Sequence, residues 1–374
     1  MSASKISQLP IINIAPFLND NPNDEPQRLA ASQALHRACV EFGFFYLNLE
    51  AFIDPKEPEE LTRLGREFFG LPQEEKDKLA LRNQDYARGY QRLKENVTNG
   101  KADNHEGLDF YKPVANPDKA KPLWGENQWP TNEMVVGFRE KYEIWVNKMK
   151  KLGTIVMRAM AVGLGMDEDE QEDLLKKVDD SFWVMRVIGY PPLPNDHDGF
   201  SCGAHKISAL TTTTRDYGCL TFLHADPTPS ALQVFLRRPG AKETDEQGLP
   251  REQGEEEGVW INADPIPGCV VCNIGERHGL TGSNCIVWET WTDGLYKSTL
   301  HRVVHRGSNY RIPFFFEPNF DALVEPLPAA LRAKAKETGV KLEDIRPEKE
   351  PIVYGEFLMK KVGNNFAVEG RDRY

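Results

Sequence analysis

The sequence has little that would bind nucleic acid or enter a membrane. Its 46 Lys and Arg residues are outnumbered by 57 Asp and Glu residues, which gives a formal net charge of -11. No basic cluster is longer than a few residues, whereas nucleic-acid binding depends on many Lys and Arg contacts to phosphate. No stretch approaches the roughly 18 consecutive apolar residues of a membrane span. The N-terminus, MSASKISQLP, lacks a basic-then-apolar signal. We therefore expect a cytoplasmic protein with neither nucleic-acid nor membrane partners.

Cysteine is also sparse, with six residues scattered along the chain, as is typical of reduced thiols in a cytosolic protein. Cys269 and Cys272 form a C-x-x-C, a spacing that can mark zinc or redox sites. They lie in an apolar run, GCVVCNIG, that predicts a buried strand. Because positions i and i+3 of a strand face opposite sides, the two sulfur atoms should not share a ligand. We expect both to be core thiols.

No internal repeat or low-complexity linker divides the chain, so two closely packed parts suit it better than two free domains. The first third predicts strands at 9–17 and 42–49, helices at 28–41 and 58–69, and a polar loop at 89–113.

The remainder of the chain has two textures. From about Met134 to Gly163, apolar residues recur at steps of three or four, which predicts a long helix lying against a sheet. From Phe182 onward the chain consists of short apolar runs separated by Gly, Pro and Asn, as in an antiparallel sandwich or jelly roll. The runs are FWVMRVIGY, CLTFLH, ALQVFL, VWINA, CVVCNI, STLHRVV and YRIPFFF. Beyond Pro326 we expect a charged helix and a strand-like piece, IVYGEFL.

One histidine and one arginine on these expected strands suggest chemistry. His301 precedes Arg311 by ten positions in GLYKSTLHRVVHRGSNYRIPFFFEP. Imidazole suits iron, and a planar guanidinium can hold a carboxylate through two parallel hydrogen bonds and stays charged when partly buried. The pair therefore suits an iron site with a carboxylated cosubstrate. Taken alone, the two residues are equally consistent with a core histidine and a surface arginine.

Further motifs extend the pattern along nearly the whole chain. They are LPIINIAPF, EFGFFYLNL, FFGLPQEEKDKL and ARGYQ, then MRVIGYPPLP, DYGCLTFL, ALQVF, WINADPIPGCVVCNIGE and TDGLYKSTLHRVV. In this order they are highly specific, and the chain resembles the isopenicillin N synthase-like branch of the 2-oxoglutarate and Fe(II)-dependent oxygenases. The resemblance implies a mostly β fold with flanking helices. Its parts are a double-stranded β-helix (jelly roll) core, a mixed α/β N-terminal region and a long supporting helix.

The resemblance also implies cofactors and site residues. Fe(II), O2 and 2-oxoglutarate are expected, with His301 as the distal metal ligand, Arg311 as the carboxylate clamp and Tyr190 as a contact of 2-oxoglutarate. The family's other two ligands sit in a string like GAH-x-DYG, which matches His205 and Asp216. Two ligands on one strand need a spacing of two, because positions i and i+2 point the same way.

Here the segment KISALTTTTR, residues 206–215, separates His205 from Asp216. The two ligands can meet at the metal only if this segment loops out and returns. A second interruption, residues 277–287, precedes WETWTDGLYKS. Since each interruption adjoins an intact motif, we hypothesise that both are retained introns or gene-model errors, which transcript sequencing tests.

Other residues leave alternatives open. His224 and Asp226 form the only uninterrupted H-x-D in the chain, so they are an alternative metal pair, and His305 is expected to share a strand face with His301. The serine that usually follows the family's arginine by two positions is Pro313 here.

An asparagine that often precedes the tyrosine by two positions is replaced by Ile188. This change and the missing serine could both weaken binding of 2-oxoglutarate, or indicate a pocket adjusted around Arg311 alone.

We expect an oxygenase that uses O2 and 2-oxoglutarate to hydroxylate or desaturate a small organic molecule. A ring-forming oxidase that needs no 2-oxoglutarate is an alternative, because the serine is missing. A catalytically impaired jelly-roll protein is another, because the H-x-D pair is interrupted. The expected regions are an N-terminal oxygenase-family region (6–130), supporting helices (131–180), the jelly-roll domain (181–320) and a helical tail (321–374).

Overall fold

Two β-sheets face each other at the centre of the protein. The computed structural model describes residues 8–95, 97–98, 101–193, 200–202, 219–237, 258–275, 287–296, 299 and 301–366. Within these residues the larger sheet has eight strands in the order β1-β2-β12-β9-β14-β7-β6-β3. The smaller sheet has four, in the order β11-β10-β13-β8. Neighbouring strands pair antiparallel except β1 and β2, which are parallel.

The strands of the larger sheet are β1 (Ile11–Asn13), β2 (Phe44–Asn48), β12 (Cys269–Ile274), β9 (Leu220–Ala225), β14 (Asn309–Phe316), β7 (Trp183–Tyr190), β6 (Glu106–Tyr111) and β3 (Gly89–Gln91). Those of the smaller sheet are β11 (Gly258–Asn262), β10 (Leu232–Arg237), β13 (His301–Val304) and β8 (Phe200–Cys202). The helices are α1 (Glu25–Glu41), α2 (Lys56–Phe69), α3 (Gln73–Asp77), α4 (Phe138–Gly163), α5 (Glu168–Lys176), α6 (Val287–Trp291), α7 (Pro328–Thr338) and α8 (Tyr354–Phe366). Two short antiparallel pairs, β4 (Val97–Thr98) with β5 (Lys101–Ala102) and β15 (Leu323–Val324) with β16 (Ile352–Val353), complete the described strands.

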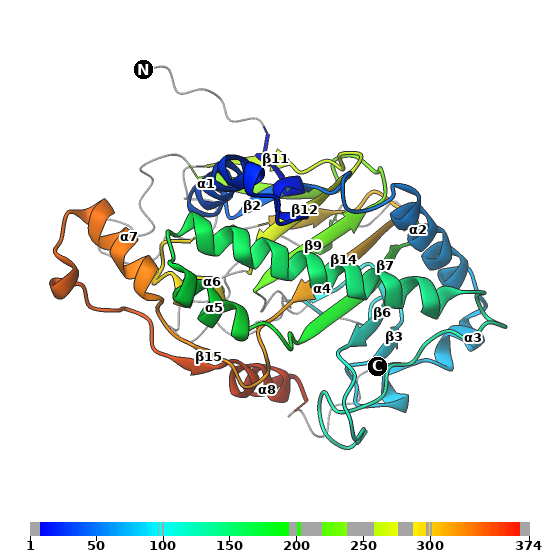
Figure 1. Ribbon diagram of the computed structural model, residues 1–374. Helices are drawn as coiled ribbons and strands as arrows, with labels where there is room; N and C mark the ends of the chain where they lie inside the picture. Colours follow the sequence, from blue (N-terminus) through cyan, green and yellow to red (C-terminus); the bar gives the residue numbers. More distant parts are fainter. Residues whose placement is uncertain are drawn as a thin grey trace.

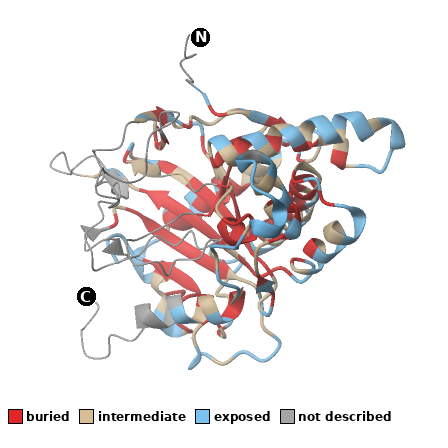
Figure 2. Cartoon of the chain, turned by 90° about the vertical axis from the view of Figure 1, so that its left-hand side faces the viewer, coloured by how far each residue is buried: buried red, intermediate tan, exposed pale blue. Residues whose placement is uncertain are grey.

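Helix α4 covers the outer face of the larger sheet, running across β9, β14 and β7 (Figure 1). Its apolar stripe packs on alternate residues of β14, among them Phe314 and Phe316, in the main core. The helix lies so close to the strand that a Cβ at Gly153 would sit 2.2 Å from the ring of Phe316. Figure 2 shows the result: the buried residues gather on the strands and the exposed ones lie on the surrounding helices and loops.

The inner face of the larger sheet packs against the smaller sheet in a second, separate core. Phe44, Tyr46 and Val271 of the larger sheet belong to it, together with Leu232 and Val234 of β10. Alternation along each strand therefore sends one set of side chains to α4 and the other to the space between the sheets. That inner space is where a jelly-roll protein can hold a ligand.

Most of the expected elements are present, and the predicted fold class is confirmed. Each apolar run predicted as a strand after Phe182 forms one, from β7 to β14. The long helix begins at Phe138 rather than near Met134, because Gly137 adopts a left-handed conformation (φ 73°) immediately before it. No helix in the described ranges is long and apolar enough to cross a membrane.

The prediction of a loop over residues 89–113 is wrong, because β3 and β6 extend the larger sheet there. Their polar side chains suggested solvent exposure, but Gln91 and Asp109 are buried. Asp109 accepts a hydrogen bond of 2.7 Å from Nε of Arg186 on β7, and its other oxygen accepts from Nε2 of Gln91 at 3.1 Å. The mutual pairing of these groups removes the cost of burying them, so a polar segment can be an inner strand.

Two further expectations concern the tail and the cysteines. The piece IVYGEFL is strand only at Ile352–Val353, and the helix α8 begins at Tyr354. The two cysteines of the C-x-x-C face opposite sides as predicted. Cys272 is buried in the main core, whereas Cys269 packs against the core between the sheets. Both are free thiols.

Candidate functional site

A cavity of about 270 Å³ opens on the inner face of the larger sheet, near the carboxyl end of β9 and the start of β14. Both sheets contribute to it, through Tyr46, Leu223 and Ala225 on one side and Leu232 on the other. The turn at residues 265–268 closes part of its wall. Its lining is mostly apolar, which is typical of a small-molecule site with a few placed polar groups.

Arg311 is the main charged group in the cavity wall. It lies on β14 opposite Ala225 of β9 and Ile188 of β7, so its side chain is on the inner face of the sheet. The residue is 4% exposed. Within the described part of the chain no carboxylate forms an ion pair with it. A buried guanidinium without an anion is unfavourable, and a ligand carboxylate would relieve this through two parallel hydrogen bonds.

Tyr190 lies beside this guanidinium, as the two residues' expected common role requires. The ring centroid is 5.5 Å from Cζ of Arg311. Tyr190 is the last residue of β7, is buried, and faces Asn309 directly across the strands. Its ring also contacts those of His105, at 5.8 Å, and His305, at 6.4 Å. The tyrosine therefore screens the cation from water, which strengthens any interaction of the cation with an anion.

His301 faces the same interior from the opposite sheet. It is the first residue of β13 and pairs with Val234, whose side chain is in the core between the sheets. Its ring meets that of Phe44 edge to face, with centroids 5.2 Å apart. The imidazole is thus directed inward, as a metal ligand on this strand needs to be.

The other two expected metal ligands, His205 and Asp216, lie outside the described residues. So do the first interruption, residues 206–215, and the second up to residue 286. Among the residues that are described, no group of three or more His, Cys, Asp and Glu side chains could hold a metal ion.

The alternative pair His224 and Asp226 is placed differently from an iron ligand pair. His224 lies opposite Ile312, a residue of the main core, and its Nε2 is 3.2 Å from Oγ1 of Thr62 on α2. Burial lowers the pKa of His224 to about 4, although the nearby carboxylate of Asp226 opposes the shift. Both residues border the cavity, but the imidazole of His224 contacts Thr62 of α2 and Trp145 of α4, the helices that cover the sheet.

Asp226 itself is occupied by a structural role. Its carboxylate accepts hydrogen bonds from the backbone N–H of Tyr310 at 3.0 Å and from the guanidinium of Arg66 at 3.1 Å. These contacts join α2 to the start of β14. The second alternative, His305, lies just beyond β13 next to Tyr190 and not on the strand that carries His301.

Sequence reasoning missed a buried polar residue in the cavity wall. Asn309, the first residue of β14, is 1% exposed and lines the cavity with Arg311. Positions i and i+2 of a strand share a face, so this residue could have been found by reading two positions back from the arginine as well as two positions forward.

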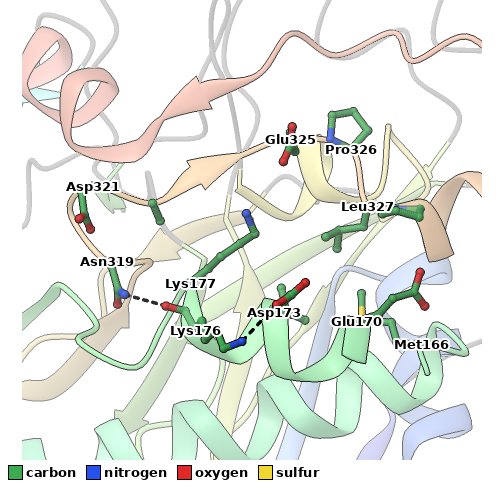
Figure 3. A pocket seen from close by; sticks show the side chains of 13 residues that line it. Met166, Glu170, Asp173, Lys176, Lys177, Asn319, Asp321, Glu325, Pro326 and Leu327 are labelled. Atoms are coloured by element: carbon green, nitrogen blue, oxygen red, sulfur yellow. Dashed lines mark hydrogen bonds and ion pairs between the residues drawn. The ribbon is translucent and has the colours of Figure 1, made fainter. Parts of the chain in front are cut away.

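A second hollow lies far from this site, between α5 and the segment that follows β14 (Figure 3). Several of the charged residues that line it already have partners on the surface. Lys176 contacts Asp173, its carbonyl accepts from Asn319, and Lys177 donates to the carbonyl of Leu323. The described residues that line it include no histidine and no buried cation, so they offer neither iron ligands nor a carboxylate anchor.

Comparison with known proteins shows the family of the chain. A family model for the 2OG-Fe(II) oxygenase superfamily matches residues 180–318, and one for the N-terminal region of non-haem dioxygenases in morphine synthesis matches residues 9–132. The chain is 37% identical to a homoarginine-6-hydroxylase of Glycine max, with 98% of this chain and 99% of that protein covered. This chain belongs to the 2OG-Fe(II) oxygenase superfamily.

Other relatives of this oxygenase are more distant. A 1-aminocyclopropane-1-carboxylate oxidase of Dictyostelium discoideum is 26% identical, with 96% of each chain covered. Among the solved structures, a full-length protein of Neurospora crassa in complex with alpha-KG has the same fold, with a TM-score of 0.71 at 24% identity and coverage of 97% of this chain and 98% of that chain.

The oxygenase is thus an enzyme that acts on small molecules with Fe(II) and 2-oxoglutarate. The described residues fit 2-oxoglutarate. Arg311 supplies a buried cation that has no acidic partner in the described ranges, and it stands at a cavity with apolar walls. The described residues fit Fe(II) in part, since His301 presents an imidazole to the same interior. When bound, iron and 2-oxoglutarate supply the oxidation; the protein supplies orientation and a dry pocket.

Proposed function

We propose that Arg311 binds the carboxylate of 2-oxoglutarate remote from its keto group, with Tyr190 packed beside it. In this proposal His301 binds iron together with His205 and Asp216. The carrying observation is that Arg311 is a buried cation at a cavity, without a carboxylate partner in the described part of the chain. The cation then fixes the cosubstrate in one orientation, and the apolar walls exclude water from the reacting end.

For the substrate, we propose homoarginine or a closely related amino acid, and hydroxylation as the outcome. Four relatives named as homoarginine-6-hydroxylases, from Glycine max, Oryza sativa and Arabidopsis thaliana, support this class. They are 34% to 37% identical over 96% to 98% of this chain. O2 is the second cosubstrate in the proposal.

Further parts of the proposal concern ancestry, regions and compartment. We assign the chain to the isopenicillin N synthase-like branch, with an N-terminal region (6–130), supporting helices (131–180), a jelly-roll domain (181–320) and a tail (321–374). We also propose that the protein works in the cytoplasm, without nucleic-acid partners. The net charge of -11 and the free thiols of the described cysteines support this. Imaging of a fluorescent fusion tests the compartment.

Substrate-dependent succinate release tests the activity. The purified chain with Fe(II), O2 and 2-oxoglutarate should form succinate with homoarginine, and less with arginine, lysine or neutral amino acids. Arg311→Leu should abolish turnover at moderate 2-oxoglutarate concentration. Arg139→Leu is the matched control, because Arg139 lies on the exposed side of α4 and pairs with Glu143. If none of the amino acids raises succinate release above the level without substrate, the proposed substrate class is rejected.

A second candidate is an oxidase that needs no 2-oxo acid, and Pro313 favours it. This residue stands two positions after Arg311, where it can donate no hydrogen bond to a cosubstrate. Binding of 2-oxoglutarate to the iron-loaded chain separates the two candidates. Iron stoichiometry of the 374-residue chain beside a variant lacking residues 206–214 tests whether the interrupted ligand pair impairs metal binding. Equal, full occupancy in both would show that the interruption is tolerated.

A further inference from the structure

The side chain of Asn309 is enclosed in the cavity wall without the partners that a buried amide normally has. The residue is 1% exposed, and its Oδ1 has no hydrogen-bond partner in the described part of the chain. Its side chain takes part in no hydrogen bond within those residues. Buried polar groups of this kind are rare and often mark a place where a ligand completes the bonding. Asn309 borders the same cavity as Arg311.

The strand geometry puts this amide beside the guanidinium. Asn309 and Arg311 are two positions apart on β14, so both face the interior and their Cα atoms are about 6.6 Å apart. Asn309 pairs directly with Tyr190 across the strands, and the guanidinium lies 5.5 Å from that tyrosine's ring centroid. The side chain of Arg311 is therefore directed along the strand towards the Asn309–Tyr190 pair.

On the other side of Arg311 the strand offers no polar group. Pro313 lies on the same inner face, opposite Leu223, and has neither a hydroxyl group nor an N–H. A carboxylate bound by Arg311 has more lone pairs than one guanidinium can satisfy, since its two oxygen atoms accept about four hydrogen bonds. The group that can supply another donor from the same strand face is the amide of Asn309.

We propose that Asn309 is the second arm of the carboxylate anchor, its Nδ2 donating to the remote carboxylate of 2-oxoglutarate that Arg311 holds. This inference rests on the proposed role of Arg311. The amide can turn about its last side-chain bond, so a carboxylate selects the nitrogen atom. A hydrogen bond to a charged group then favours binding by about ten- to a hundredfold.

The test is a binding comparison on the iron-loaded full chain without oxygen, by calorimetry. The two ligands are 2-oxoglutarate and 2-oxopentanoate, which has the same chain length but lacks the second carboxylate. Asn309→Ala should weaken 2-oxoglutarate binding about ten- to a hundredfold and leave 2-oxopentanoate binding unchanged. Unchanged 2-oxoglutarate affinity, or equal weakening of both ligands, would overturn the proposal.

Two further variants separate this proposal from its premise and from a folding effect. Arg311→Leu should weaken 2-oxoglutarate binding more than Asn309→Ala does; if it has no effect, the proposed anchor itself fails. Asn127 is a structural control, because its amide exchanges two hydrogen bonds with the backbone of Tyr111. Asn127→Ala should lower the unfolding temperature without changing ligand affinity. Asn309→Ala should weaken ligand binding without lowering the unfolding temperature, since it removes an amide whose oxygen has no partner among the described residues. A lower unfolding temperature in the ligand-free Asn309 variant, with unchanged ligand affinity, would assign Asn309 a structural role and reject ours.

Discussion

The buried ion pair between Asp109 and Arg186 should hold the N-terminal part of the larger sheet in place. Asp109 is 0% and Arg186 8% exposed, and Gln91 bonds to both. Burial alone would lower the pKa of Arg186, but the adjacent carboxylate outweighs it and the pKa is raised. Removing one partner leaves the other charge buried and unpaired, so Asp109→Leu should lower the free energy of unfolding by about 3–5 kcal/mol.

The double variant Asp109→Leu/Arg186→Met supplies the decisive comparison. Replacing both charges by apolar side chains removes the unpaired cation, so it should recover most of the loss, and the coupling between the sites should be at least about 2 kcal/mol. The assay is urea unfolding at pH 7 of Asp109→Leu, Arg186→Met, the double variant and the parent chain. Glu143→Leu is the exposed control, since its pair with Arg139 should contribute less than about 1 kcal/mol. Losses that simply add in the double variant, or a loss below about 1 kcal/mol for Asp109→Leu, would refute this account of β6 and β7.

Three other predictions follow from packing and protonation. The pKa of His224 is lowered to about 4, so below pH 6.5 the unfolded state binds more protons than the folded state. The free energy of unfolding should therefore fall by about 3 kcal/mol in total as the pH drops from 6.5 towards 4. In His224→Gln the dependence of this free energy on pH should be weaker, and an unchanged dependence would contradict the shift. Gly153→Ala should destabilise the protein by about 1–3 kcal/mol in urea unfolding despite the better helix propensity of alanine, because the new methyl group meets the ring of Phe316; a gain in stability would show that α4 can move away. Under native conditions a thiol reagent should modify Cys269 well before Cys272, as read by peptide mass spectrometry, and added zinc should protect neither; protection of both would revive a metal site.

Periodicity was sufficient to predict most of the fold, because both packing faces are strongly apolar. The apolar stripe on α4 and the alternation of side chains on β14 could be recognised in the sequence, because each element must bury one face. The same reasoning failed for β3 and β6. There the inner side chains are polar and neutralise each other across strands, and a pattern of single residues does not show which charges will meet.

The positions of the candidate site residues could be predicted to a similar extent. Arg311 and Tyr190 lie together, and His301 faces the same interior, as the motifs led us to expect. The H-x-D spacing of His224 and Asp226 was ambiguous, since spacing says that two side chains share a face but not which face it is. The pairing of His224 with Ile312 answers that question, because Ile312 belongs to the core under α4. The roles of all five candidate residues, Arg311, Tyr190, His301, His205 and Asp216, stay predictions.

On the inner face of the larger sheet, Arg311 lies between the apolar wall of the cavity and a pair of buried charges. At the cavity, β2, β12 and β9 present the side chains of Tyr46, Val271 and Leu223 inward. On the other side of Arg311, the inner face of β7 and β6 carries Tyr190 and the Asp109–Arg186 pair. A ligand with a charged end and a carbon chain can satisfy both halves only in one direction, with its carboxylate on β14 and its carbon atoms over β9. Because the charges beyond β14 are already paired, they cannot compete with Arg311 for the ligand. If Arg311 anchors the carboxylate as proposed, the paired charges on β6 and β7 therefore contribute to specificity without touching the ligand.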